Sequence, residues 1–152
     1  MAPRPQKVVL DTNCYIDASR TDSASRALQN FCAAAAPGLY MSAVVASELR
    51  AGASERDRAR LERDVVTPFS RRDRLLVPSG ASWVALGTTL AALRKHEGLV
   101  LKQVPRSFLF DILIAHSCRE AGAVLISRNT ADMKRIARVF SFDFAEPYPT
   151  RW

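Results

Sequence analysis

The chain has 152 residues, 48% of them apolar, and its 22 Lys and Arg against 15 Asp and Glu give a net charge of +7. This composition excludes an intrinsically disordered chain. It also excludes a membrane helix, since no apolar run reaches the roughly 18–20 residues needed, so we expect a single cytoplasmic domain over residues 1–152. This excess of basic residues favours a polyanionic partner, above all nucleic acid.

Five short apolar runs bounded by polar or turn residues predict strands. They are residues 7–10, 39–41, 74–77, 123–126 and 141–144. Apolar residues that recur every three or four positions predict helices between them. These helices cover residues 15–19, 22–36, 42–51, 55–69, 82–96, 107–121 and 130–138, with a loop at 98–106. Strands that alternate with helices predict an α/β fold whose central, mostly parallel sheet is covered on both faces.

Asp11 comes directly after the first predicted strand and is followed by Thr12 and Asn13. A carboxylate in this position lies at the carboxyl end of the strand, and open α/β sheets bind their ligands at that edge. The alternative is structural, because Asp is a preferred N-cap residue and would cap a helix that begins at Thr12. Both interpretations remain open for Asp11 alone.

Two further acids lie in apolar surroundings. Glu48 follows the second predicted strand in a helix of small and apolar residues, and Arg50, two positions later, points to another side of that helix. Asp111 is flanked by apolar residues on both sides, where an ionised carboxylate is costly unless it is paired or bound to a metal. The structural alternatives are a solvated Glu48 near a helix end and an Asp111 favoured by the helix dipole after a cap at Ser107.

Asp132 follows the fourth predicted strand, together with Ser127 and Asn129. A structural role is open here too, because Asn129 as N-cap and Asp132 in the first turn make a good helix start. Four clustered carboxylates repel one another unless a cation lies between them, and Mg²⁺ or Mn²⁺ accepts such oxygen ligands. A metal held in this way activates water and polarises a phosphoryl oxygen. An acidic site on a basic protein therefore predicts metal-dependent phosphodiester hydrolysis.

Four blocks of the chain resemble, in the same order, the motifs of the PIN-domain family and, within it, of the VapC-type toxin ribonucleases. The blocks are residues 8–13, 42–52, 110–115 and 121–132. The resemblance implies a Rossmann-like α/β/α sandwich and an endoribonuclease that needs Mg²⁺ or Mn²⁺, as the toxin of a toxin–antitoxin pair. It also implies a homodimer, RNA as the substrate and an antitoxin protein that blocks the site.

The same resemblance assigns roles to eight residues. Asp11 and Asp111 would be the core metal ligands, and Glu48 and Asp132 would complete the acidic catalytic site. Four neighbours would orient these ligands: Thr12, Asn13, Ser127 and Asn129. Apart from the resemblance, five basic residues in loops or in the last block are predicted RNA contacts: Arg71, Arg72, Lys102, Arg106 and Arg128.

The remaining reactive side chains suit structural roles. Cys14, Cys32 and Cys118 are odd in number and widely spaced, which favours buried free thiols over a disulfide or a zinc site. His116 stands five positions after Asp111, on a different face of the predicted helix. We therefore expect His116 in the core or at the rim of the site rather than in catalysis.

Three other functions stay open. A phosphatase of the haloacid-dehalogenase type also has Asp after its first strand, but it needs a second Asp two positions on, where this chain has Asn13. A PIN-like module that only binds RNA or a partner would not need all four acids. A housekeeping PIN nuclease without an antitoxin would lack the small antitoxin reading frame that we expect directly upstream.

Overall fold

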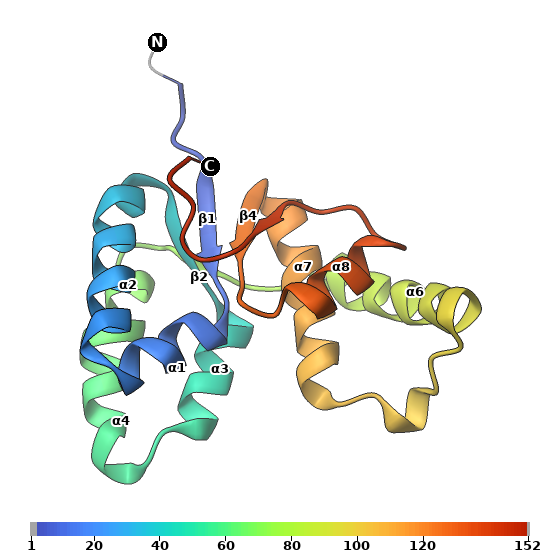
Figure 1. Ribbon diagram of the computed structural model, residues 1–152, viewed down its shortest axis with the longest axis horizontal. Helices are drawn as coiled ribbons and strands as arrows, with labels where there is room; N and C mark the ends of the chain where they lie inside the picture. The colour runs from blue at the N-terminus through green and yellow to red at the C-terminus, as the bar shows by residue number, and fades with distance from the viewer. Residues whose placement is uncertain (1–2, 152) are drawn as a thin grey trace.

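A five-stranded sheet is the centre of the computed structural model, which describes residues 3–151 (Figure 1). The strands are β1 (Lys7–Leu10), β2 (Leu39–Ser42), β3 (Leu75–Leu76), β4 (Ala123–Ile126) and β5 (Phe144–Ala145). Their order is β3-β2-β1-β4-β5, and all neighbours run parallel, which confirms the predicted sheet. The strand order reverses at β1, because the chain continues to β2 on one side and to β4 on the other. In open α/β sheets, ligands bind beside such a reversal.

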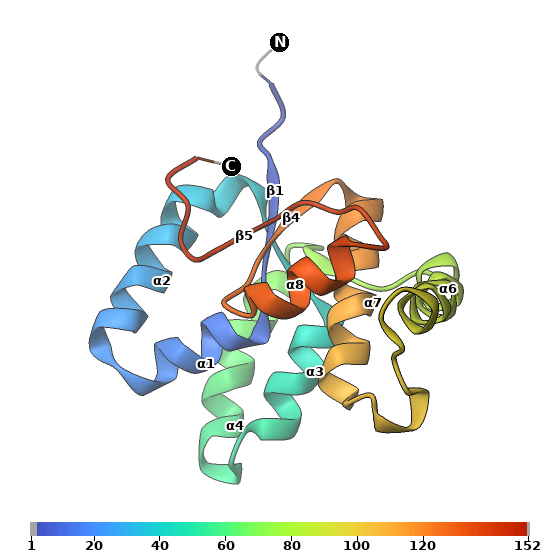
Figure 2. The same ribbon diagram turned by 45° about the vertical axis from the view of Figure 1, so that its right-hand side comes forward.

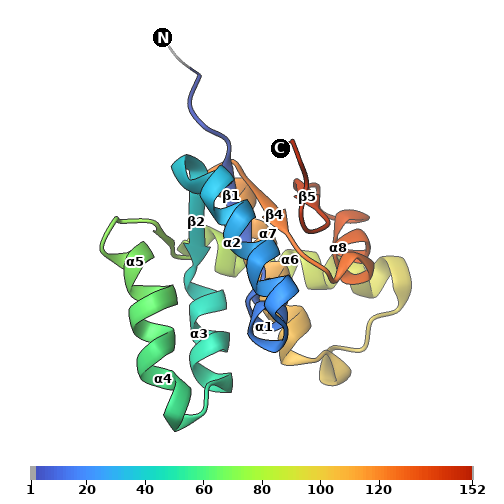
Figure 3. The same cartoon turned by 60° about the vertical axis from the view of Figure 1, so that its left-hand side comes forward.

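Helices cover both faces of the sheet (Figures 2 and 3). They are α1 (Thr12–Arg20), α2 (Asp22–Ala35), α3 (Ala43–Gly52), α4 (Glu55–Leu61), α5 (Thr67–Ser70), α6 (Gly80–Glu97), α7 (Arg106–Ala121) and α8 (Thr130–Ala137). Alternate residues of a strand face opposite layers. Val8 and Leu10 accordingly pack with α1 and α2, whereas Val9 packs with α3, α6, α7 and α8. The α/β/α sandwich is confirmed, and none of the helices within residues 3–151 has the length and apolarity needed to cross a membrane.

Three helices begin earlier than predicted because a different residue precedes their first turn. Asp11 caps α1, which starts directly after it rather than at the predicted helical turn. Ser79 caps α6 through a hydrogen bond from a backbone N–H of the first turn. Pro105 precedes α7, whose first residue is Arg106, so the predicted cap at Ser107 is wrong. Pro is tolerated there because it lies before the positions whose N–H groups the helix uses.

The helix predicted over residues 55–69 is interrupted. After α4 the chain passes through a π-helical segment, Glu62–Val66, into α5. Pro68 accounts for the interruption, because it has no N–H and its ring would clash with the carbonyl four positions earlier in a regular α-helix. The loop predicted over residues 98–106 contains a short 3₁₀ helix, Leu101–Gln103. The last strand lies at Phe144–Ala145 rather than at 141–144, because it pairs there with β4.

Candidate active site

Asp11 lies at the carboxyl end of β1 and is almost fully buried. Its carboxylate accepts three hydrogen bonds: from the backbone N–H of Thr12 at 2.8 Å, from Ser127 Oγ at 2.6 Å and from Asn13 Nδ2 at 3.0 Å. Burial raises the pKa of Asp11, and these hydrogen bonds act in the opposite direction. The structural interpretation is confirmed because Asp11 caps α1; it also lies at the carboxyl edge of the sheet, and its functional role stays a prediction.

Asn13, Ser127 and Asn129 join the ends of β1 and β4. Asn13 Nδ2 donates to Ser127 Oγ at 3.2 Å, and Asn13 Oδ1 accepts the backbone N–H of Arg128 at 3.1 Å. Ser127 Oγ also accepts the backbone N–H of Asn129 at 3.1 Å. A hydroxyl that donates to Asp11 while it accepts two hydrogen bonds is held in one orientation. The turn after β4 is therefore fixed against the carboxylate that follows β1.

Glu48 reaches the same edge from α3. Thr12 Oγ1 donates a hydrogen bond of 2.5 Å to Glu48 Oε2, which links α3 to the first turn of α1. Partial burial raises the pKa of Glu48, and the negative charge of Asp11 adds to this effect. The positive charge of Arg106 acts in the opposite direction, so this arginine lies within electrostatic reach of the acid.

Asp111 and Asp132 meet at Asn129. The amide Nδ2 of Asn129 donates to Asp132 Oδ2 at 2.7 Å and more weakly to Asp111 Oδ2 at 3.4 Å. Burial raises the pKa of Asp111 to about 8, and the negative charges of Asp11, Asp132 and Glu48 add to this effect. Within residues 3–151, none of the four acids forms an ion pair with Lys, Arg or His. Arg106 therefore acts on Glu48 without an ion pair, and the described residues supply no paired cation for this cluster of acids.

The donor set of this edge suits a hard divalent cation. All eight predicted residues belong to one hydrogen-bonded network, and its carboxylate, hydroxyl and amide oxygens are the ligands that Mg²⁺ and Mn²⁺ take. In the described part of the chain, no three carboxylate, imidazole or thiol side chains form a metal cage by themselves. Mg²⁺ is commonly held by one or two carboxylates and several waters, so an open arrangement of acids suits it.

Two of the predicted RNA contacts lie near the acids. Arg106 begins α7, and its guanidinium lies 5.9 Å from the ring centroid of Phe110. Arg128 follows β4 and forms an ion pair with Asp17. Sequence reasoning missed Asp17, although it stands one helical turn after Asn13, and side chains four positions apart share a helix face. Asn13 and Asp17 thus hold the backbone and the side chain of Arg128 from the same face of α1.

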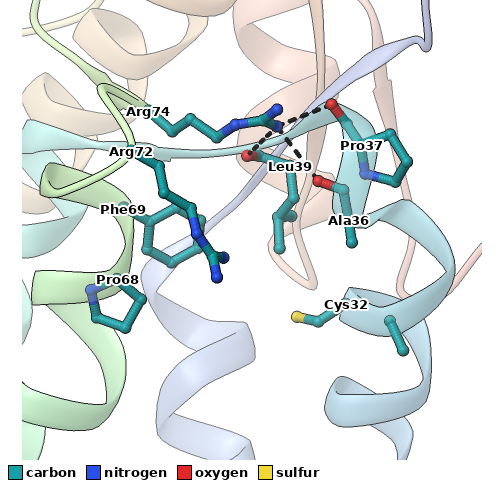
Figure 4. Close-up of a pocket in the computed structure, with 9 residues that line it drawn as sticks. Cys32, Ala36, Pro37, Leu39, Pro68, Phe69, Arg72 and Arg74 are labelled. Atoms are coloured by element: carbon teal, nitrogen blue, oxygen red, sulfur yellow. Dashed lines mark hydrogen bonds between the residues drawn. The ribbon is translucent and has the colours of Figure 1, made fainter.

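The other predicted RNA contacts are not brought to the acids. Lys102 is an exposed residue of the 3₁₀ helix before α7. Arg71 and Arg72 precede β3 and therefore lie at the amino edge of the sheet, opposite the acids. There a cavity of about 570 Å³ has Arg72 and Arg74 among its lining residues (Figure 4). The two edges of the sheet thus carry separate groups of charged residues.

Cys14, Cys118 and His116 are buried as the sequence predicted, whereas Cys32 is only partly so. All three thiols are free, Cys14 and Cys118 are buried, and Cys32 is half-buried. Burial raises the pKa of Cys32 to about 11, which leaves it protonated at neutral pH. His116 is a core residue, because its Nε2 lies 2.8 Å from Thr89 Oγ1 and its ring packs on Phe140.

The model of the PIN domain family matches residues 8–139 of the chain, which includes every acid of the site. The chain belongs to the PIN domain family. PIN domains are nucleases, so the chain belongs to a family of hydrolases that act on phosphodiester bonds. The match begins within β1 and ends just after α8, so this PIN domain takes in four of the five strands. No curated protein matches the chain.

Solved structures support the same fold. A chain in the structure of FitAB bound to an IR36 DNA fragment is similar with a TM-score of 0.70 and 16% identity, over 95% of this chain and 98% of that chain. A chain of FitAcB from Neisseria gonorrhoeae is similar with a TM-score of 0.64 and 18% identity, over 90% of this chain and 95% of that chain. A chain of DNA-bound VapBC from Salmonella typhimurium is similar with a TM-score of 0.61 and 21% identity, over 93% of this chain and 98% of that chain. At these identities the likeness shows the PIN fold alone.

Proposed function

We propose that this PIN domain, as one unit over residues 1–152, is a Mg²⁺- or Mn²⁺-dependent endoribonuclease and the toxin of a toxin–antitoxin pair. One observation carries the proposal. Asp111 is buried beside Asp11 at the carboxyl edge of the sheet, and within the described residues no cation of the chain pairs with either carboxylate. A bound divalent cation would compensate this charge at the place where open α/β sheets bind ligands.

The residues of the carboxyl edge have different proposed roles. Asp11 and Asp111 would hold the metal, and Glu48 and Asp132 would complete the acidic site directly or through water. When bound, the metal supplies an activated water and polarises a phosphoryl oxygen. Asn13 and Ser127 hold the carboxylate of Asp11 in place, Asn129 holds those of Asp111 and Asp132, and Thr12 holds that of Glu48.

RNA would approach over the predicted basic contacts that precede α7, begin it or follow β4. Arg106 and Arg128 flank the site, and Lys102 lies on the segment before α7. Guanidinium groups contact phosphates in pairs of hydrogen bonds, and a net charge of +7 attracts a polyanion over longer distances. We propose a single-stranded loop of a structured RNA as the substrate, since such loops expose their bases to proteins. A map of cleavage sites confined to duplex RNA would contradict this choice of substrate.

The antitoxin partner rests on the similar structures. One of them is a toxin–antitoxin complex from Klebsiella pneumoniae, with a TM-score of 0.58 and 23% identity over 93% of this chain and 98% of that chain. We propose that this chain likewise binds an antitoxin in the cytoplasm, encoded directly upstream. Co-expression with that upstream protein should suppress RNA cleavage; an unchanged rate would leave a nuclease without an antitoxin.

The test is cleavage of total cellular RNA by the purified protein with Mg²⁺, with Mn²⁺ and with EDTA. Discrete fragments are expected with either metal, none with EDTA, and none from Asp11→Asn. The matched control is Asp143→Asn, because Asp143 is an exposed acid remote from this network. If the folded wild type cleaves nothing with any metal, the chain is an RNA- or partner-binding PIN domain.

A further inference from the structure

Asp17 on α1 pairs with two arginines. Its Oδ2 forms an ion pair with Nε of Arg128, which follows β4, and its Oδ1 lies 3.7 Å from Nη1 of Arg20 in the last turn of α1. The other ion pairs of the described residues each join one acid to one arginine. The group around Asp17 therefore carries an unbalanced positive charge, which attracts an anion.

Both guanidinium groups have donors left for a ligand. A guanidinium has five N–H donors, and one carboxylate shared by two arginines cannot occupy all of them. The side chain of Arg20 is 70% exposed and that of Arg128 is 47% exposed, whereas that of Asp17 is 29% exposed. Ion pairs on the surface contribute little to stability, so the fold alone gives no strong reason for two arginines at one acid.

The position of Arg128 is tied to the acidic site. Asn13 Oδ1 accepts the backbone N–H of Arg128 at 3.1 Å, and Asn13 Nδ2 donates to Asp11 at 3.0 Å. Asp17 and then Arg20 follow Asn13 on the same face of α1. At a rise of roughly 1.5 Å per residue, Asp17 lies about 9 Å along the helix from Asp11. This distance suits a phosphate beside the one that the acids would hydrolyse, rather than that phosphate itself.

We propose that Arg20 and Arg128 together bind a neighbouring phosphate of the RNA strand, and that Asp17 is a positioning residue that holds both arginines for this contact. The proposal rests on the ribonuclease function proposed above. α1 extends from the carboxyl end of β1 to the side opposite to α7, whose first residue is Arg106 (Figures 1 and 2). The acidic site thus has arginines on two sides, and a strand that crosses it would meet a guanidinium on each side.

Asp17 would strengthen RNA binding although its own charge repels phosphate. A free arginine side chain loses much conformational freedom when it binds a ligand, and a side chain that is already held loses less. The ion pair from Asp17 and the backbone bond from Asn13 hold Arg128 before any RNA is present. Positioning and simple charge attraction therefore predict opposite effects of removing the carboxylate of Asp17.

The first measurement is the affinity for a labelled oligouridylate in EDTA, which removes the metal that cleavage needs. Arg20→Ala and Arg128→Ala should each weaken binding severalfold and reduce the slope of log affinity against log salt by about 1. The matched control is Arg26→Ala, which removes an exposed arginine of α2 and should have a smaller effect. Equal effects in all three variants would show attraction by net charge alone and overturn the proposal, as would unchanged binding in Arg20→Ala and Arg128→Ala.

The second measurement separates positioning from charge. Asp17→Asn should bind the oligouridylate severalfold more weakly than the wild type, although it removes a negative charge. Asp17→Glu keeps the carboxylate and should restore most of the affinity. The matched control is Asp22→Asn, which neutralises an exposed acid of α2 and should bind at least as tightly as the wild type. A folded Asp17→Asn variant that binds as tightly as the wild type, or more tightly, overturns the positioning role.

The third measurement asks whether Asp17 acts through the two arginines. In a chain that carries Arg20→Ala and Arg128→Ala, the further change Asp17→Asn should not weaken binding. A loss in that background as large as in the wild type overturns the proposal.

These outcomes are separate from the cleavage test. A wild type that cleaves RNA, with Arg20→Ala and Arg128→Ala variants that bind normally, remains a nuclease and lacks this phosphate contact. A wild type that binds no oligouridylate at low salt and cleaves no RNA contradicts both proposals.

Discussion

The two edges of the sheet differ in whether the chain itself supplies partners for their charged side chains. At the carboxyl edge, Asp11 and Asp111 are buried without an ion pair from the described residues, and burial together with neighbouring acids raises the pKa of Asp111. At the amino edge, the guanidinium of Arg74 donates to the backbone oxygens of Ala36, Pro37 and Leu39, at 3.2, 2.8 and 3.4 Å (Figure 4). Among the described residues, the acids of the carboxyl edge have no ion-pair partner, whereas backbone oxygens of the chain bind the guanidinium of Arg74 at the amino edge.

This difference distinguishes Arg74, whose charge stabilises the fold, from the acids of the carboxyl edge, whose charge we propose serves to bind a metal. Arg74 satisfies the carbonyl groups at the end of α2, where a cation is favoured, and so it joins that helix to the start of β2 and β3. The acids of the carboxyl edge instead lower the stability of the metal-free fold, since a buried carboxylate without a cation is costly. A chain that keeps such acids together indicates that a ligand supplies the missing charge.

The largest expected effect is on the rate of RNA cleavage, which should fall in a variant of the carboxyl edge and change little in a variant of the amino edge. Asp111→Asn should lower the rate of RNA cleavage by a factor on the order of 10³, because a metal ligand and its charge are lost. Arg72→Gln, at the amino edge, should change the rate by less than about tenfold, since it removes at most a distant electrostatic attraction. Equal losses in the two variants would show that the amino edge takes part in the reaction.

The next effect is on stability. Substitution of a core residue usually lowers the Tm, whereas Asp111→Asn should raise it. The pKa of Asp111 is near 3.8 in an unfolded chain, and burial raises it to about 8 in the folded, metal-free protein. Between these values the folded chain binds the extra proton, so this carboxyl group makes the wild type less stable as the pH rises. In EDTA, Asp111→Asn should therefore gain Tm relative to the wild type from pH 4 to pH 8. A Tm difference that is constant over this range would contradict the burial of an uncompensated acid.

At the amino edge, the same kind of change should be destabilising. Arg74→Gln leaves the backbone oxygens of Ala36, Pro37 and Leu39 without their charged donor, at a cost of about 1 kcal/mol in the free energy of unfolding, because water reaches these partly exposed bonds. Urea denaturation measures this loss, and Arg72→Gln serves as the control, with a change of at most about 0.5 kcal/mol. RNA cleavage by folded Arg74→Gln should stay near that of the wild type. A stable Arg74→Gln variant would remove the contrast between the edges.

The smallest effect concerns RNA binding. If Arg106 contacts one phosphate, Arg106→Ala should weaken RNA binding and reduce the slope of log affinity against log salt by about 1. Arg71→Ala, at the opposite edge, is the control and should leave this slope unchanged. The reverse result would place the RNA over the amino edge.

Chain order accounts for the residues that directly follow β1 and β4, whereas Glu48 and Asp111 lie inside helices and were predicted from their apolar surroundings and from the family motifs. A polar residue directly after a buried strand lies at the carboxyl edge of a parallel sheet, which applies to Asp11 and to Ser127. The same rule gives the place of Arg71 and Arg72, whose role as RNA contacts stays a prediction. They come before a strand, not after one, and so they belong to the amino edge.

Other features depend on contacts that no local pattern encodes. The bond from Thr12 to Glu48 joins residues 36 positions apart, and the ion pair of Arg128 with Asp17 joins two elements across the sheet edge. The exposure of Trp83 and Val84 on α6 was not predicted either, because leucine periodicity predicts the buried side of a helix and says nothing of the opposite side. These features required the packing of the whole chain.

The central claim is that a divalent cation supplies the charge that the carboxyl edge lacks, and the most direct test is the Tm in Mn²⁺ against EDTA. Mn²⁺ should raise the Tm of the wild type, because it binds the folded chain alone. The rise should be nearly absent in Asp11→Asn and Asp111→Asn and undiminished in Asp143→Asn. An equal rise in all four proteins, or no rise in the wild type, would contradict the account.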